Sequence, residues 1–202
     1  MLDKITVYSY RRCPFAMRVR IALHEKGIPF EVVEEDLKNF SQKLISLHPE
    51  AKVPVLVHAN RVIYESAIIT EYVNDLPSEQ KSLMPEAAGE KAEVRLWTYW
   101  CNYHFKPDLD RYKYGTIRFT EAECLGAEER LRKHLEKIED RLEKNPWLVG
   151  EGFSLAEVHL FPFVRQLSRI QPTPHFLVGF QSVLKWRDHL SARPSILKAL
   201  EK

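Results

Sequence analysis

The sequence predicts a protein of mixed class, a small α/β domain followed by an all-helical domain. Over about the first 75 residues, short β-branched or aromatic segments alternate with amphipathic ones in the order βαβ and then ββα. A polar, proline-bounded stretch follows, and beyond it apolar residues recur at helical spacing to the end of the chain. We therefore expect an α/β domain at residues 1–76, a linker at 77–87 and a helical domain at 88–202.

The elements of the first domain follow from apolar patterning and from capping signals. Pro14 suits the first turn of a helix, where its missing N–H costs nothing, and Gly27 stops the run. Ser41 and Ser66 are expected to cap the next two helices. The last two strands lie close enough in sequence to pair as a hairpin. The predicted strands cover residues 4–9, 28–34, 53–57 and 62–64, and the predicted helices cover residues 14–26, 41–47 and 67–74.

Two capping boxes mark helix starts in the second domain. The first, Thr120 with Glu123, is expected to open one long helix that carries Leu125 on its apolar stripe. The second, Ser154 with Glu157, opens an apolar helix that should form the core of the domain. The predicted helices run over residues 88–104, 120–144, 155–170 and 181–190, and from Pro194 on.

Composition limits the classes of function. With 30 basic and 28 acidic residues the net charge is +2, which gives no electrostatic footprint for nucleic acid. No apolar run is long enough to span a membrane, and the N-terminus lacks a signal-peptide pattern. The three cysteines lie at spacings typical of neither a disulfide framework nor a metal site. We therefore expect a cytoplasmic protein that binds no metal, nucleic acid or membrane.

Cys13 is the residue with the most distinctive chemical setting. It directly precedes Pro14 and so lies at a helix N-terminus, where unpaired N–H groups and the macrodipole favour an anion. A thiol there loses its proton more readily, and the thiolate is the nucleophile. Arg11, Arg12 and Arg18 would add to this effect if they point inward. The alternative is that Cys13 is a small buried apolar residue and the arginines are solvated.

A reactive Cys13 would have to act without a second thiol beside it. The partner position of a Cys-x-x-Cys pair is occupied by Ala16, so an internal disulfide is excluded. A lone thiolate can form a mixed disulfide that an external thiol resolves by exchange. Glutathione is the abundant external thiol in a reducing compartment, so we expect it to be the co-substrate.

Four motifs in the right order resemble those of the soluble glutathione transferases, and most closely the cysteine-type (omega-like) and glutaredoxin-like members. They are Cys-Pro-Phe-Ala at 13–16, Lys-Val-Pro-Val-Leu at 52–56, Tyr-Glu-Ser at 64–66 and Gly-Phe-Ser-Leu-Ala-Glu at 152–157. The resemblance covers essentially the whole chain. It implies a thioredoxin-like N-terminal domain, an all-helical C-terminal domain and a homodimer.

The resemblance also implies a glutathione site. Its Val53–Pro54 bond would be cis, and the Val53 backbone would pair with the cysteine of glutathione; on base rates alone a trans proline is the simpler reading. Glu65 and the helix N-terminus at Ser66 would receive the ammonium and carboxylate of the γ-glutamyl group, although Ser66 could act only as a cap. Lys38 or Lys52 would hold the glycyl carboxylate.

Other residues keep more than one interpretation. Phe15 either shields the thiolate or packs in the core. Ser9 is a minor alternative to Cys13, because other transferase classes use an N-terminal serine or tyrosine to stabilise the thiolate of glutathione. The second substrate should contact aromatic side chains of the helical domain, for which we select Trp97, Trp100, Tyr103 and His104.

The predicted function is glutathione-dependent thiol transfer through Cys13, which covers mixed-disulfide reduction, dehydroascorbate-type reduction and deglutathionylation. The nearest alternative is conjugation of glutathione to an electrophile, in which Cys13 only assists. A non-catalytic binding protein of the stringent-starvation type is the alternative from another class. A chloride-channel-like membrane form shares the Cys-Pro-Phe start, but no segment here favours insertion.

Overall fold

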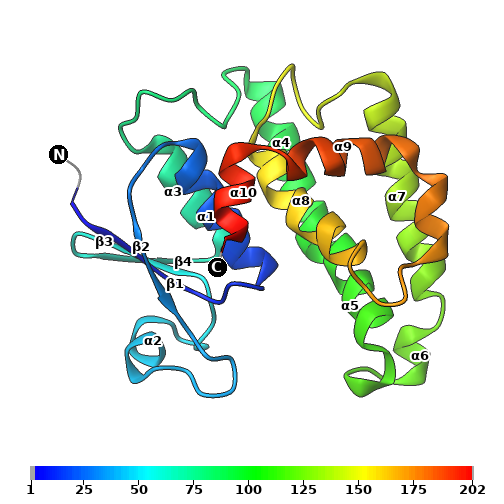
Figure 1. The fold of residues 1–202 in the computed structure, drawn as a ribbon, viewed down its shortest axis with the longest axis horizontal. Coiled ribbons are helices and arrows are strands. Elements are labelled where there is room, and N and C mark those ends of the chain that lie inside the picture. Colours follow the sequence, from blue (N-terminus) through cyan, green and yellow to red (C-terminus); the bar gives the residue numbers. More distant parts are fainter. Residues whose placement is uncertain (1–2, 202) are drawn as a thin grey trace. The chain divides into compact units, whose positions relative to one another are not determined.

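The computed structural model describes residues 3–201, which form two compact units (Figure 1). One unit runs to Met84 and also takes in the chain from Arg193 onward, and the other spans Pro85–Ala192. The predicted fold class, a thioredoxin-like domain and an all-helical domain, is confirmed. The expected boundaries differ from these units at the C-terminal end, because the sequence prediction assigned all of residues 88–202 to the helical domain.

The N-terminal unit is built on a four-stranded mixed sheet with the order β2-β1-β3-β4. β1 pairs in parallel with β2 and antiparallel with β3, and β3 and β4 form the predicted antiparallel hairpin. The two central strands supply most of the buried residues of the sheet, whereas β2 is exposed throughout. The strands are β1 (Ile5–Ser9), β2 (Glu31–Glu34), β3 (Val55–His58) and β4 (Arg61–Tyr64).

Helix α1 is the central helix of this unit. It packs against α3 and against the C-terminal helix α10. Glu25 at the end of α1 accepts a hydrogen bond from Arg193 Nη2 at 2.8 Å and another from the Ser195 hydroxyl. These long-range contacts attach the end of the chain to the first unit. The helices are α1 (Pro14–Glu25), α2 (Gln42–Leu47), α3 (Ser66–Asp75) and α10 (Pro194–Leu200).

The second unit is helical and has α8 at its core. Nearly every residue of α8 is buried, and α4, α5 and α9 contact it. The predicted capping box is confirmed: Ser154 caps α8, and buried Glu157 accepts bonds from the Ser154 backbone and side chain. The helices are α4 (Ala88–Trp100), α5 (Lys106–Tyr114), α6 (Glu121–Cys124), α7 (Ala127–Lys144), α8 (Leu155–Leu167) and α9 (Gln181–Ser191), and one π-helical turn (Cys101–Phe105) joins α4 to α5.

The prediction of one long helix after Thr120 is wrong. The Thr120 capping box forms, but it opens only the short helix α6. Gly126 has φ +69 and precedes α7, so the chain turns there, and Leu125 is 78% exposed rather than part of an apolar stripe.

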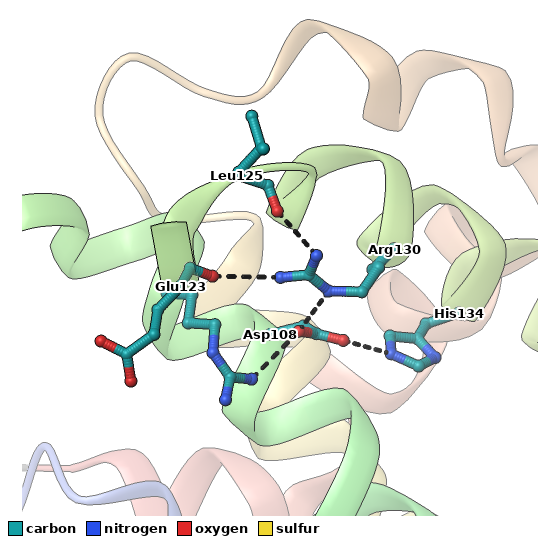
Figure 2. Close-up of polar contacts among 6 residues, drawn as sticks. Asp108, Glu123, Leu125, Arg130 and His134 are labelled. Atoms are coloured by element: carbon teal, nitrogen blue, oxygen red, sulfur yellow. Dashed lines mark hydrogen bonds and ion pairs between the residues drawn. The ribbon is translucent and has the colours of Figure 1, made fainter. Parts of the chain in front are cut away.

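A buried carboxylate, Asp108 of α5, secures this turn (Figure 2). Arg130 of α7 donates to Asp108 at 2.8 Å and to the backbone carbonyl oxygens of Leu125 at 2.7 Å and Glu123 at 3.3 Å. His134 Nε2 lies 3.0 Å from the other Asp108 oxygen. Arg130 therefore supplies donors to carbonyl groups that the break in the helix leaves unpaired.

Within residues 3–201, no helix has the length and apolar character needed to cross a membrane.

Candidate active site

The loop between β1 and α1 presents Cys13 at the start of the helix. The Cys13 backbone N–H donates to the Tyr10 carbonyl at 2.9 Å, which closes the turn. Cys13 is the N-cap residue of α1, and Pro14 is the first residue of the helix, as predicted. The thiol is half-buried, and its Sγ lies 4.0 Å from the Val53 carbonyl oxygen. The positive end of the α1 dipole therefore lies at a partly accessible sulfur.

A cavity of about 220 Å³ brings together most of the residues predicted for glutathione. Val53 connects this cavity to Cys13, and the Val53–Pro54 bond is cis, as the resemblance implied. Phe15 is half-buried and contributes to the wall. The cavity is lined by Phe15, His48, Lys52, Val53, Pro54, Glu65 and Ser66.

The prediction that Ser66 caps its helix is wrong. The N-cap residue of α3 is Glu65, and Ser66 is the first helical residue. The Ser66 hydroxyl is buried and accepts a hydrogen bond from Arg18 Nη1 at 3.1 Å. Arg18 is itself fully buried, with its guanidinium carbon 5.1 Å from the centre of the Phe15 ring. Ser66 thus links the two helices whose N-termini face the site.

Glu65 has an unusual backbone. Its φ of 66° and ψ of 114° are rarely adopted by a residue with a side chain, and its side chain makes no capping hydrogen bond to α3. Such strain costs on the order of 1 to 3 kcal/mol and tends to occur at functional sites. The exposed Glu65 carboxylate lines the cavity beside the first N–H groups of α3.

The two lysines proposed for the glycyl carboxylate differ in position. Lys52 lines the cavity and forms an exposed ion pair with Glu50. The hydrogen bond from Lys52 lowers the pKa of Glu50, and the same bond raises the pKa of Lys52. Lys38 does not line the cavity, and its backbone N–H donates to Asp36 at 3.0 Å. Lys52 is therefore the better placed of the two.

Sequence reasoning missed His48. Its ring is buried, with its centre 4.7 Å from that of the Tyr64 ring, and it lines the cavity. The Glu50 backbone N–H donates to His48 Nδ1 at 3.0 Å, which leaves Nε2 as the ring donor. A single histidine just after a short helix gives no local signal of this role.

Ser9, the minor alternative for stabilising the thiolate of glutathione, is fully buried, and its hydroxyl accepts a hydrogen bond from Arg20 at 2.6 Å. None of the three cysteines forms a disulfide, and the Cys101 thiol donates to the His159 carbonyl at 3.7 Å. Among residues 3–201 no group of histidine, cysteine, aspartate and glutamate side chains could hold a metal ion.

The aromatic residues selected for the second substrate fall into two groups. Trp97 and Trp100 contact each other edge to face, and the Lys137 ammonium lies 4.8 and 4.5 Å from their ring centres. Tyr103 and His104 line a separate cavity of about 390 Å³ together with Asp108, Arg111 and Arg130. The four side chains therefore do not line one common cavity.

Two family models match the chain. The glutathione S-transferase N-terminal domain matches residues 3–75, and the glutathione S-transferase C-terminal domain matches residues 101–194. The chain belongs to the glutathione S-transferase family. This glutathione S-transferase is 30% identical over 201 residues to glutathione S-transferase U28 of Arabidopsis thaliana, covering 98% of this chain and 89% of that protein. It is 34% identical over 170 residues to glutathione S-transferase omega-1 of Sus scrofa, covering 83% of this chain and 68% of that protein.

A solved structure of glutathione S-transferase III in apo form superimposes with a TM-score of 0.82 and 27% identity, covering 98% of this chain and 96% of that one. The predicted membership of the glutathione S-transferase family is thereby confirmed, and with it a transferase that uses glutathione as co-substrate. The relatives include both omega and plant proteins, so family membership leaves the chemistry of Cys13 to be argued from the site.

Proposed function

We propose that this glutathione S-transferase catalyses thiol transfer through Cys13. The observation that carries the proposal is the position of this cysteine at the N-cap of α1, half-buried, with Sγ 4.0 Å from Val53 O and next to the cavity. The N-terminus of a helix lowers the pKa of a thiol, and the thiolate is the reactive form. A residue in that position can act as a nucleophile.

The proposed reaction proceeds in two exchange steps. Cys13 thiolate attacks the glutathionyl sulfur of a mixed disulfide, which forms a Cys13–glutathione disulfide and releases the substrate as a thiolate. A second glutathione thiolate then attacks the glutathionyl sulfur of this adduct. That step forms oxidised glutathione and regenerates the Cys13 thiolate. Ala16 cannot supply an internal resolving thiol, so the second glutathione is required.

Charge complementarity supports the proposed glutathione site. The γ-glutamyl end carries an ammonium and a carboxylate, which suit the Glu65 carboxylate and the unpaired N–H groups that begin α3. The glycyl carboxylate suits the Lys52 ammonium. Val53 lines the same cavity, and its carbonyl oxygen is 4.0 Å from the Cys13 sulfur. The cysteine of glutathione is therefore proposed to lie along the Val53 backbone.

Conjugation of glutathione to an electrophile is the second candidate, favoured by the 30% identity to a plant glutathione S-transferase over nearly the whole chain. In that reaction the sulfur of glutathione attacks, and the residue at position 13 only stabilises its thiolate. A hydroxyl could do this as well as a thiol. The two reactions therefore differ in whether the sulfur of Cys13 is indispensable.

Replacing Cys13 by Ser tests the proposal. We expect Cys13→Ser to reduce the mixed disulfide of glutathione and 2-mercaptoethanol at a rate about 100-fold or more below that of the wild type, because the nucleophile is removed. Turnover of a chlorodinitrobenzene with glutathione should persist. Cys13→Ala controls for loss of the polar group, and mass spectrometry of the wild type should detect the glutathione adduct on Cys13. Unchanged disulfide reduction in Cys13→Ser, with no adduct, would overturn thiol transfer and leave conjugation.

The proposal extends to a homodimer that acts on a small-molecule second substrate in a reducing cytoplasm. Two large apolar side chains one turn apart on α4, Leu96 and Tyr99, are more than half exposed and support self-association. Sedimentation velocity at micromolar concentration should give one species of twice the chain mass. A species of single-chain mass would contradict the homodimer without affecting thiol transfer.

A further inference from the structure

We propose that Arg20 is a positioning residue for Cys13, which fixes the loop before the cysteine and biases its thiol toward the thiolate. The inference rests on the proposed function and extends it to a residue outside the glutathione cavity. Arg20 lies two turns into α1 and is almost completely buried.

Three hydrogen bonds from Arg20 join separate parts of the N-terminal unit. Nη2 donates to the Arg11 carbonyl at 2.7 Å, and Nη1 donates to the Ser9 hydroxyl at 2.6 Å. Nε donates to the Ala199 carbonyl of α10 at 3.1 Å. One side chain therefore holds the end of β1, the loop before Cys13 and the C-terminal helix.

The peptide groups of Arg11 are held from two directions by opposite charges. Its carbonyl accepts from Arg20, and its backbone N–H donates to Glu34 Oε1 at 2.6 Å. Arg11 is two residues before Cys13, within the turn closed by the bond from Cys13 N to Tyr10 O. The conformation that presents the thiol at the helix N-terminus is therefore held by this pair.

The charge of Arg20 is not neutralised by a carboxylate in direct contact. Within the described chain its hydrogen-bond acceptors are two carbonyls and a hydroxyl, and it forms no salt bridge. Burial lowers the pKa of Arg20, while negative charge on Glu34 and on Cys13 acts in the opposite direction. A guanidinium this poorly compensated favours an anion at Cys13, and Glu34 partly offsets it.

Other charged groups also lie near the loop or the cavity, and they are the same in the wild type and in the variants compared below. They are Arg11 and Arg12 on the loop, Arg18 on α1, Lys52 and Glu65 beside the cavity, and Lys198 and Glu201 near the C-terminus.

A pair of charge-neutralising variants separates positioning with electrostatic bias from a merely structural role. Arg20→Gln and Glu34→Gln each remove one charged partner of the Arg11 peptide. If the pair only stiffens the loop, both variants move the reactivity of Cys13 in the same direction. If its charges act on the thiolate, Arg20→Gln raises the apparent pKa of Cys13 and Glu34→Gln lowers it, each by about half a pH unit or more.

The readout is the rate of Cys13 alkylation by iodoacetamide between pH 5 and 10, followed by mass spectrometry of the Cys13 peptide so that the other cysteines remain in place. Arg20→Lys keeps the charge and should stay near the wild-type pKa. Arg193→Gln removes a contact of α10 with α1 and should leave the Cys13 profile unchanged. Glu34 is exposed, so its variant remains informative if Arg20→Gln does not fold.

The inference is supported if the apparent pKa of Cys13 is higher in Arg20→Gln than in the wild type and lower in Glu34→Gln. Shifts in the same direction, or a folded Arg20→Gln with a wild-type profile, overturn it. The order is independent of the absolute pKa. A wild-type Cys13 that forms no glutathione adduct would therefore reject thiol transfer while the inference on Arg20 is still decided.

Discussion

The fully buried guanidinium of Arg18 donates a hydrogen bond to the Ser66 hydroxyl across 3.1 Å and thereby joins α1 to α3. The N-terminus of α1 carries Cys13, and the N-terminus of α3 carries Glu65. The contact therefore sets the spacing between the proposed nucleophile and the proposed receptor of the γ-glutamyl group. Two positive helix ends converge on one small cavity because a buried side chain fixes the helices to each other.

Replacing Ser66 by Ala tests this link. We expect Ser66→Ala to destabilise the N-terminal unit by about 1 to 2 kcal/mol, because a buried guanidinium loses an acceptor, and to weaken glutathione binding several-fold. Ser41→Ala is the matched control, since Ser41 accepts from Leu44 N at 3.1 Å as the true cap of α2 and does not line the cavity. It should cost about 1 kcal/mol and leave binding intact. Calorimetric titration with glutathione and denaturant unfolding measure both effects; equal losses of affinity in the two variants would contradict the link.

Local sequence signals predicted the elements that are determined locally. Pro14 begins α1, Ser41 caps α2, and the box at Ser154 opens α8, because each signal satisfies backbone groups a few residues away. The prediction of one long helix after Thr120 failed for a reason that is not local. The capping box forms, but Gly126 adopts a left-handed conformation, and Asp108 of another helix stabilises the break through Arg130.

The parts of the site that sequence reasoning missed depend on distant contacts. Ser66 was expected to be a cap, and only the packing of α1 against α3 gives it Arg18 as a partner. The position of His48 in the cavity and the packing of α10 against α1 also depend on tertiary contacts. Apolar periodicity within a segment carries no information about such contacts. Cys13 could be selected from its local position before Pro14, whereas Val53 and Glu65 could be selected only because the family resemblance supplied their relationship to Cys13.

The two lysines give a direct comparison at the glycyl end of glutathione. Lys52→Ala should weaken glutathione binding by about 3- to 10-fold, the range expected for one exposed charge contact. Lys38→Ala should change it less than 2-fold, because Lys38 lies outside the cavity. The dependence on salt should also fall in Lys52→Ala alone. Equal effects of the two substitutions would remove Lys52 from the proposed site.

Glu157 should make the stability of the helical unit fall as the pH rises. Burial raises the pKa of this carboxyl from 4.5 to about 7, although hydrogen bonds from Leu148 and Ser154 oppose the shift. The folded state then binds more protons than the unfolded state between those values, so stability is full below pH 4.5 and declines through pH 7. The decline should be on the order of 1 to 3 kcal/mol.

Tryptophan fluorescence can follow this transition, because all four tryptophans, Trp97, Trp100, Trp147 and Trp186, lie in the helical unit. Urea unfolding at pH 5, 6, 7 and 8 should show the decline in the wild type. Glu157→Gln cannot ionise and should lack this decline, keeping only the pH dependence that other groups such as His134 contribute. A wild type with the same profile as the variant would mean that Glu157 is ionised throughout, held by its three donors.

Asp108 should have the opposite pH dependence. Burial alone would raise its pKa, but hydrogen bonds from Arg130 and His134 outweigh it and hold the pKa below the ordinary 3.8. Burial lowers the pKa of His134 despite its contact with Asp108. Both shifts mean that the unfolded state takes up protons first, so stability is present at neutral pH and is lost as the pH falls, from about 6.5 for His134 and from about 3.8 for Asp108.

Asp108→Asn should therefore destabilise the helical unit by about 2 kcal/mol at pH 7, a value reduced from that of a fully buried pair because Arg130 and Arg111 are 40% and 30% exposed. The amide retains one acceptor oxygen and cannot serve two arginines and His134 equally. Asp110→Asn, which removes the partner of Lys106 on the same helix, is the matched control and should cost about 0.5 kcal/mol.

The α6–α7 turn should also become accessible to proteolysis near Leu125 in Asp108→Asn, because Arg130 loses the carboxylate that orients it toward the carbonyls of that turn. Equal stability of the two variants, with an intact turn, would show that Asp108 does not secure it.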